Sequence, residues 1–305
     1  MKKIILVVGP TSVGKTDLSL ILANKINGEI VSADSRQIYK GMDIGTDKPS
    51  EEIRMRVKHY MIDIVDPDEY YSAGRYSREA RQVVDQVISE GKYPIVVGGA
   101  GLYIRALTDG IFPENKKDYN VKRELRERVE REGIRNLYDY LKRIDPQSAS
   151  HLSPKDVQRI VRAVEVFEVT GKPFSEFLNI ECTPIKHNLL FIGLKRDRAE
   201  LYQRIEKRVD LMIKRGLIEE VKMLREKGYD RDLDSMRAVG YREIHQHLDG
   251  EITLNEAINL IKQRSRNYAK RQITWFNNEK RINVFQVSEN KKIENIAESV
   301  IKIID

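Results

Sequence analysis

An apolar strand, a glycine-bounded loop and an amphipathic helix follow one another at residues 4–26. The strand is expected over 4–8 and the helix over 15–26, and the loop fits G-x-x-x-x-G-K-[ST] at every position. In such a loop the backbone N–H groups turn toward a diphosphate, the lysine adds a charge, and the hydroxyl can bind Mg²⁺. A plain glycine turn would not explain the Lys-Thr pair. The predicted diphosphate site consists of Gly9, Pro10, Thr11, Ser12, Val13, Gly14, Lys15 and Thr16.

Further strand-like runs indicate a parallel sheet. They occur at 29–33, 59–65, 93–98, 188–194 and 282–287. Helical patterns at 74–90 and 101–109 separate the earlier runs. Apolar strands that alternate with helices are typical of a parallel sheet covered on both faces. The predicted fold class is α/β, a P-loop NTPase-like parallel sheet flanked by helices.

The alternation of strands and helices stops after Phe112. Residues 120–144 and 154–170 then have helical periodicity, with Pro154 expected in a first turn and Gly171 closing the helix. Strand character returns at 188. We therefore expect an all-helical insertion domain at 113–186 within a core domain of residues 1–112 and 187–305, whose later helices include a long one over 254–277.

Composition excludes several classes of protein. No apolar run approaches the roughly 18 residues that a membrane span needs. Because the first strand is expected within four residues of Met1, no targeting peptide is expected. The single cysteine, Cys182, excludes disulfides within the chain and cysteine-based zinc sites. A cytoplasmic location is expected.

Positive charge is distributed unevenly along the chain. Residues 1–112 contain 15 Lys/Arg and 15 Asp/Glu, so the net charge of +7 comes from the residues that follow. Residues 257–278 contain five basic residues and no acid. Basic helices are usually solvated, yet an acid-free stretch of this length favours contact with a polyanion such as a nucleic-acid backbone. From their spacing alone, Trp275 and Phe276 are expected in the core.

The acid that usually accompanies nucleotide hydrolysis is missing. The strand at 93–98 leads into Gly99, whereas the run EIVSA at 29–33 is followed directly by Asp34. In a parallel sheet Asp34 would lie at the same edge as the phosphate loop, either as a reactive carboxylate or as a residue that caps a turn. A small-molecule or nucleotide kinase, and an RNA-binding regulator switched by a nucleotide, both stay open on these observations.

Six segments together resemble one known family. They are GPTSVGKTDLSL, SADSRQIYKGMDIGTDKP, VVGGAGLYIRAL, DVQRIVRAVEVFEVTGKP, SMRAVGYREI and AKRQITWF, and they extend from residue 9 to 276. In this order they resemble the tRNA dimethylallyltransferases, in the bacterial form that has no zinc finger. The resemblance implies transfer of the dimethylallyl group from dimethylallyl diphosphate to the N6 amine of the adenosine 3′ of the anticodon in tRNA, with release of diphosphate.

The resemblance also implies roles for individual residues. Asp34 would be the general base for the amine, and Lys15, Thr16, Arg208 and Mg²⁺ would stabilise the departing diphosphate. The partner is the tRNA anticodon stem-loop, and we expect a monomer. The residues implied in tRNA binding are Asp34, Ser35, Arg36, Gln37, Ala100, Lys122, Gln158, Arg159, Ile160, Val161, Arg162, Arg237, Ala238, Val239, Gly240, Tyr241 and Arg242.

One position departs from the family pattern. The second glycine loop usually reads Gly-Gly-Thr-Gly-Leu-Tyr, and here Ala100 replaces the threonine. The resemblance implies that the missing hydroxyl would line the reaction channel. Alanine keeps the small size of the side chain but supplies no hydroxyl there.

Overall fold

The computed structural model describes residues 2–111, 119–178, 182–288 and 292–304. It divides into two compact units, Met1–Thr108 with Ile185–Asp305, here called the core unit, and Asp109–Pro184, here called the helical unit. These bounds lie a few residues from those predicted, and the predicted start of the insertion at 113 falls outside the described residues.

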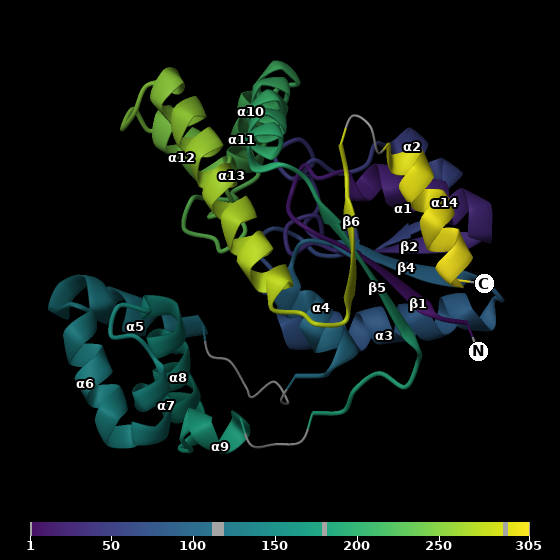
Figure 1. Cartoon of the computed structure of the whole chain (residues 1–305). Coiled ribbons are helices and arrows are strands. Elements are labelled where there is room, and N and C mark those ends of the chain that lie inside the picture. The colour runs from purple at the N-terminus through teal and green to yellow at the C-terminus, as the bar shows by residue number, and fades with distance from the viewer. Residues whose placement is uncertain (1, 112–118, 179–181, 289–291, 305) are drawn as a thin grey trace. The chain divides into compact units, whose positions relative to one another are not determined.

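The core unit is built on a parallel sheet, as the sequence predicts (Figure 1). Its order is β3-β2-β4-β1-β5-β6, and every pair of neighbours is parallel. The strands are β1 (Ile4–Val8), β2 (Gly28–Ala33), β3 (His59–Tyr60), β4 (Tyr93–Gly98), β5 (Leu189–Lys195) and β6 (Ile282–Gln286). The strand expected over 59–65 is wrong beyond Tyr60, because Met61 and Asp63 have positive φ angles and turn the chain.

Helices bury both faces of the sheet. All five residues of β1 are buried, and Ile5 and Val7 belong to an apolar cluster that includes Leu18 of α1 and Val300 of α14. The helices before β5 are α1 (Lys15–Ile26), α2 (Glu51–Arg56), α3 (Ala73–Ser89) and α4 (Gly101–Thr108). Those after it are α10 (Arg198–Lys214), α11 (Leu217–Glu226), α12 (Tyr241–Leu248), α13 (Leu254–Asn277) and α14 (Ile293–Ile304).

The helical unit has a core of its own. Its helices are α5 (Tyr119–Glu132), α6 (Ile134–Ile144), α7 (Pro146–His151), α8 (Val157–Thr170) and α9 (Phe174–Leu178). Leu137 and Leu141 of α6 pack with Ile160 and Val164 of α8, and all four are buried. The chain therefore buries a second apolar centre within Asp109–Pro184.

Two local predictions in the helical unit need correction. The helix predicted over 120–144 is interrupted at Gly133, whose φ of 80° is outside the helical range. Pro154 is not in a first turn, because α8 begins at Val157, where the side chain of Asp156 accepts a hydrogen bond from Arg159 N. Gly171 caps the C-terminus of α8, as predicted.

Replacement of Leu141 by alanine tests the independence of the two cores. The side chain is fully buried, so its truncation should cost about 2–5 kcal/mol within the helical unit. Hydrogen exchange resolved by peptide should accelerate in α5–α8 while β1, β4 and β5 keep their protection. Equal loss of protection in the sheet would show that the two cores unfold as one.

Candidate active site

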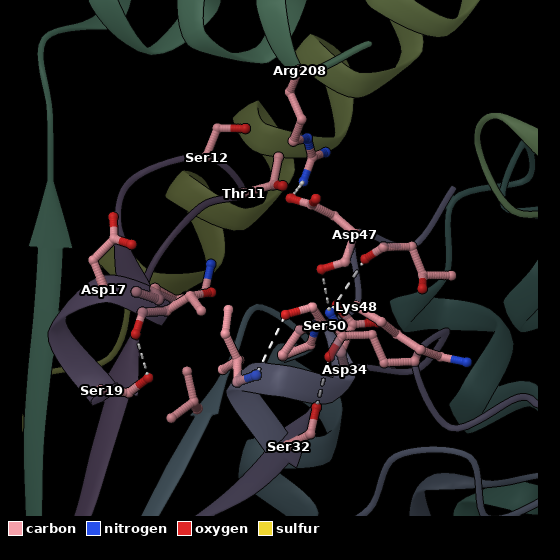
Figure 2. A pocket seen from close by; sticks show the side chains of 18 of the residues that line it. Thr11, Ser12, Asp17, Ser19, Ser32, Asp34, Asp47, Lys48, Ser50 and Arg208 are labelled. Carbon is pink, nitrogen blue, oxygen red and sulfur yellow. Dashed lines mark hydrogen bonds and ion pairs between the residues drawn. The ribbon is translucent and has the colours of Figure 1, made fainter. Parts of the chain in front are cut away.

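The strand register brings three loops to one edge of the sheet. Gly98 pairs with Val8 on one side and with Ala33 on the other, so the phosphate loop, Asp34 and Gly99 all begin at the same level. A side chain at Gly98 would place its Cβ 2.0 Å from Ala33 O, which explains why a glycine is needed there. Beyond this edge lies a cavity of about 590 Å³, lined by the phosphate loop, Asp34, residues 46–50 and α10 (Figure 2).

The phosphate loop has the conformation that its sequence predicts. Gly14 has a φ of 111°, which is unfavourable for other residues, and α1 begins at the next residue. Thr16 is exposed in the first turn and lines the cavity. On the opposite wall, Arg204 of α10 donates from Nε to Ser12 O at 2.9 Å. Helix α10 therefore holds the loop and borders the cavity at the same time.

Lys15 turns its ammonium group back over the loop. Nζ donates to Gly9 O at 3.0 Å and to Pro10 O at 2.8 Å. Burial lowers the pKa of Lys15 to about 8; the Asp34 carboxylate opposes the shift and the Arg208 guanidinium adds to it. The loop lysine therefore loses its charge as pH rises through about 8, unless an anion binds beside it.

Asp34 caps a turn and also faces the cavity. Its Oδ1 accepts from Arg36 N at 2.8 Å and from Gln37 N at 3.3 Å. Both hydrogen bonds found for this side chain in the described residues use Oδ1, and Asp34 lines the cavity. The two interpretations of Asp34, a turn cap and a reactive carboxylate, are thus compatible. Oδ1 can fix the turn while Oδ2 acts as the reactive oxygen.

Two donors beside the cavity have no acceptor in the described part of the chain. They are Ser12 Oγ in the phosphate loop and Arg208 Nε on α10. A buried N–H or O–H without a partner costs about 1–3 kcal/mol. Both residues line the cavity and both are shown in Figure 2. An anion bound between the loop and α10 would supply the acceptors that these groups lack.

The loop that follows Asp34 is held by polar contacts within the core unit. Gln37 donates from Nε2 to Thr46 O at 3.2 Å, and Arg36 donates from Nη1 to Asp234 O at 2.7 Å. Ser35 is half-buried. The Gln37 amide and the Arg36 guanidinium thus each donate to a backbone carbonyl, and of these residues Gln37 and Thr46 line the cavity.

A buried glutamine links the two glycine loops. Gln272 of α13 accepts from Thr11 N at 2.9 Å and donates to Gly99 O at 2.9 Å. Its neighbour Tyr268 has its pKa raised to about 12 by burial and by the Asp34 carboxylate. The sequence analysis missed Gln272, and only its position in the segment AKRQITWF could have indicated it.

The second glycine loop packs against α13. Ala100 N donates to Ala33 O at 3.2 Å, and α4 starts at the following residue. A Cβ at Gly101 would lie 2.3 Å from the Trp275 ring. Trp275 and Phe276 form an edge-to-face pair with ring centroids 5.0 Å apart, and both are half-buried rather than fully in the core.

The basic stretch at 257–278 is less open than its sequence suggests. Arg264 is ion-paired with Glu243, which is fully buried, and Arg266 is ion-paired with Glu206. Acids from other helices therefore neutralise these two arginines, which the sequence alone could not reveal. Lys270 and Arg271 are exposed.

Glu243 organises the segment at residues 237–242. It accepts from Gly240 N at 2.7 Å and from Arg242 Nη2 at 3.2 Å. Arg237 lies 4.0 Å from Asp234 and is partly exposed. The side chains of Ala238 and Tyr241 are buried and that of Val239 is half-buried. The two arginines are therefore the accessible charges of this segment.

The remaining candidate residues belong to the helical unit. Gln158 and Arg159 are exposed on α8, and Lys122 is half-buried on α5. Arg162 lies 3.1 Å from the buried Glu165. The side chains of Ile160 and Val161 are buried in the core of this unit, so a ligand on the surface could reach only their backbone.

Metal-binding and membrane-spanning features were sought in the described residues. No group of three or more histidine, cysteine, aspartate or glutamate side chains there could hold a metal ion. No helix of the described chain combines the length and apolar character needed to cross a membrane.

Comparison with known proteins gives a consistent result. The family model for IPP transferase matches residues 37–279. The chain is 48% identical over 289 residues to tRNA dimethylallyltransferase 2 of Geotalea uraniireducens, covering 94% of this chain and 93% of that one. It is 44% identical to the tRNA dimethylallyltransferase of Alkaliphilus oremlandii, with 99% and 96% coverage.

Solved structures agree with the sequence relatives. The full-length tRNA isopentenylpyrophosphate transferase of Bacillus halodurans superposes with a TM-score of 0.72 at 39% identity, covering 100% of this chain and 97% of that one. A eukaryotic dimethylallyltransferase, solved acting on tRNA, superposes with a TM-score of 0.81 at 30% identity, covering 99% of this chain and 78% of that one.

The lowered pKa of Lys15 predicts a pH dependence for anion binding. Below about pH 8 the ammonium is charged and attracts an anion, and above it the amine becomes neutral. The affinity for inorganic diphosphate should therefore fall as pH rises through 8, by up to about tenfold per unit. In Lys15→Arg the charge persists, so calorimetric titrations of both proteins from pH 7 to 9.5 should diverge. Parallel curves would contradict the placement of Lys15.

Proposed function

The chain belongs to the IPP transferase family, whose members transfer a prenyl group to tRNA, and we propose that its donor is dimethylallyl diphosphate bound in the cavity beside the phosphate loop. The observation that carries the proposal is the position of Asp34 on the wall of that cavity, together with the loop lysine. The carboxylate and the phosphate loop lie at the same edge of the sheet. The carboxylate can remove a proton while the loop stabilises the departing diphosphate, in one step.

The acceptor is the N6 amine of the adenosine on the 3′ side of the anticodon. This amine is a poor nucleophile, because its lone pair is delocalised into the ring. In the proposed step the N6–C1 bond forms, the C1–O bond to diphosphate breaks, and the N6 proton passes to Asp34. Oδ2 is the oxygen for this transfer, since Oδ1 holds the turn through Arg36 N and Gln37 N.

Charge that grows on the diphosphate is stabilised by the loop and by α10. Lys15, the loop N–H groups and the α1 N-terminus lie on one side, and Arg208 with its unsatisfied Nε lies on the other. Ser12 Oγ adds a further donor. The N–H of Thr11 already donates to Gln272, so a contact from Thr11 would use its hydroxyl.

Magnesium fits the oxygen donors at this edge. Mg²⁺ is usually held by one or two protein groups, phosphate oxygens and water, so it needs no cage of carboxylates. Thr16 is exposed in the first turn of α1 and lines the cavity, where its hydroxyl would be a ligand. When bound, the ion would neutralise part of the charge on the diphosphate.

The acceptor is presented by the anticodon stem-loop of tRNA. Because the reacting base must leave its stack, the enzyme needs cations for the backbone and polar groups for the base. Arg237 and Arg242 of the core unit, and Gln158 and Arg159 of the helical unit, are accessible for these contacts. We further propose a monomer located in the cytoplasm.

A kinase is disfavoured, because the family match and the relatives are prenyl transferases. The experiment that tests the proposal is nucleoside analysis of unmodified tRNA after incubation with the protein, Mg²⁺ and dimethylallyl diphosphate. The expected product is adenosine with a dimethylallyl group on N6. Transfer of the γ-phosphate of ATP to an acceptor, with no prenylated nucleoside, would favour the kinase. Unchanged bound tRNA would favour an RNA-binding regulator.

Asp34→Asn should separate the chemical role of Asp34 from its structural role. Asparagine keeps Oδ1 for the turn but replaces Oδ2 with an amide nitrogen that cannot take a proton. We expect both substrates to bind nearly as in the parent, while single-turnover prenylation slows on the order of 10²–10⁴-fold. A loss below about tenfold would mean that another group is the base. Partial rescue at higher Mg²⁺ would assign Asp34 to the metal instead.

Arg159→Ala should weaken tRNA binding through the lost charge. Its side chain is 74% exposed on α8, so the substitution should leave the helical unit folded. Affinity falls as salt rises, and the loss of one phosphate contact should reduce the steepness of this fall, on a log–log plot, by about 0.7–0.9. Arg56→Ala is the matched control, because Arg56 is also 74% exposed but lies on α2. Equal slopes for both variants would exclude Arg159 from the interface.

A further inference from the structure

Asp47 places a carboxylate against the cations on the α10 side of the cavity. Its Oδ2 lies 3.6 Å from Arg208 Nη1, and its Oδ1 lies 3.7 Å from Arg215 Nη1 (Figure 2 shows the Arg208 pair). All three residues line the cavity. Both separations exceed hydrogen-bond length, and the Asp47 side chain is 40% exposed, so these are weak pairs that an anion can displace.

The backbone around Asp47 is held in place from several sides. Asp47 has a φ of 55°, a left-handed conformation that Asp and Asn tolerate better than most residues. Its N–H donates to Ile44 O at 3.1 Å and its carbonyl accepts from Gln37 Nε2 at 3.3 Å. Beside it, Lys48 is buried and donates to Tyr39 O at 2.6 Å and to Asp43 at 2.7 Å.

A buried glutamate fixes the start of the same turn. Glu220 of α11 accepts hydrogen bonds from the N–H groups of Asp43, Ile44 and Gly45, at 3.0, 2.7 and 3.2 Å, and from Tyr241 Oη at 2.5 Å. These hydrogen bonds hold the backbone of Asp47, whose carboxylate lies beside Arg208 and Arg215. The Asp47 backbone is therefore a fixed part of the cavity wall.

We propose that Asp47 competes with diphosphate for Arg208 and Arg215, and so weakens the binding of both the donor and the product. The inference rests on the proposed function, in which Arg208 binds the diphosphate. An anion that contacts Arg208 Nη1 must displace the carboxylate, and an anion that contacts only Nε is repelled by the carboxylate at close range. The consequence for the enzyme is faster release of diphosphate at the expense of donor affinity.

Asp47→Asn removes the charge and keeps a residue that tolerates the left-handed backbone. Inorganic diphosphate, titrated calorimetrically into the whole protein, should bind about threefold to tenfold more tightly than to the parent, since one or two partly exposed pairs no longer compete. The gain should shrink as salt is raised. In steady-state prenylation, product inhibition by diphosphate should strengthen by a similar factor and the KM for the donor should fall.

Asp210→Asn is the matched control. Asp210 lies on α10 with a similar exposure, but pairs with Lys262 at 2.7 Å and does not line the cavity. This variant changes the net charge equally and should bind diphosphate like the parent. An equal gain in diphosphate affinity in both variants would show that net charge alone causes the effect, and would overturn the proposal.

Each remaining outcome supports or overturns the competition proposed between Asp47 and diphosphate. Unchanged binding in Asp47→Asn overturns the inference, and weaker binding that depends on Mg²⁺ would make Asp47 a metal ligand, which also overturns it. Prenyl transfer by the parent is measured in the same preparation. If the parent transfers no prenyl group but the variant binds diphosphate more tightly, the proposed function is refuted. The competition between Asp47 and diphosphate is then still supported. A parent that binds no diphosphate refutes both.

Discussion

The site depends on the register between three parallel strands. Because Gly98 of β4 pairs with both Val8 of β1 and Ala33 of β2, the segments that follow these three strands leave the sheet side by side. Close approach of Gly98 to Ala33 tolerates no side chain. A one-residue slip would turn buried strand residues to the opposite face and separate Asp34 from the phosphate loop. The position of Asp34 beside the phosphate loop follows from this alignment.

Charge in the cavity is balanced by few and specific partners. Lys15 is held over its own loop by two carbonyls, and its burial makes the ammonium costly without an anion. Arg208 keeps an unsatisfied Nε while it shares Asp47 with Arg215. These cations are therefore incompletely neutralised by the protein, which favours an anion as their partner, and in the proposed function this anion is a diphosphate. In the proposal made above, the Asp47 carboxylate shortens the time for which that partner stays bound.

Buried polar groups from the later helices hold the loops in place. Gln272 reaches both glycine loops from α13, Glu220 binds three consecutive N–H groups from α11, and Glu243 binds Gly240 N and two arginines. Buried carboxylates and amides are favourable only when their hydrogen bonds are satisfied. The core unit therefore uses polar groups of α11–α13 to support these loops, in addition to the apolar side chains that the same helices bury.

The sequence by itself determined the phosphate loop, the set of parallel strands, the helical insertion and Asp34 as a candidate, because each depends on local pattern: a motif, an apolar run or a helical period. It did not determine the short β3, the break at Gly133 or the state of the charged side chains. Thr11 and Gln272 are 261 positions apart, and Arg208 meets Asp47 only because α10 packs beside the loop. Likewise, an acid-free stretch looked open until Glu206 and Glu243 approached it from other helices. Such pairings arise from packing between distant segments, which local periodicity does not encode, so only the tertiary structure decided which charges are paired and which face the cavity.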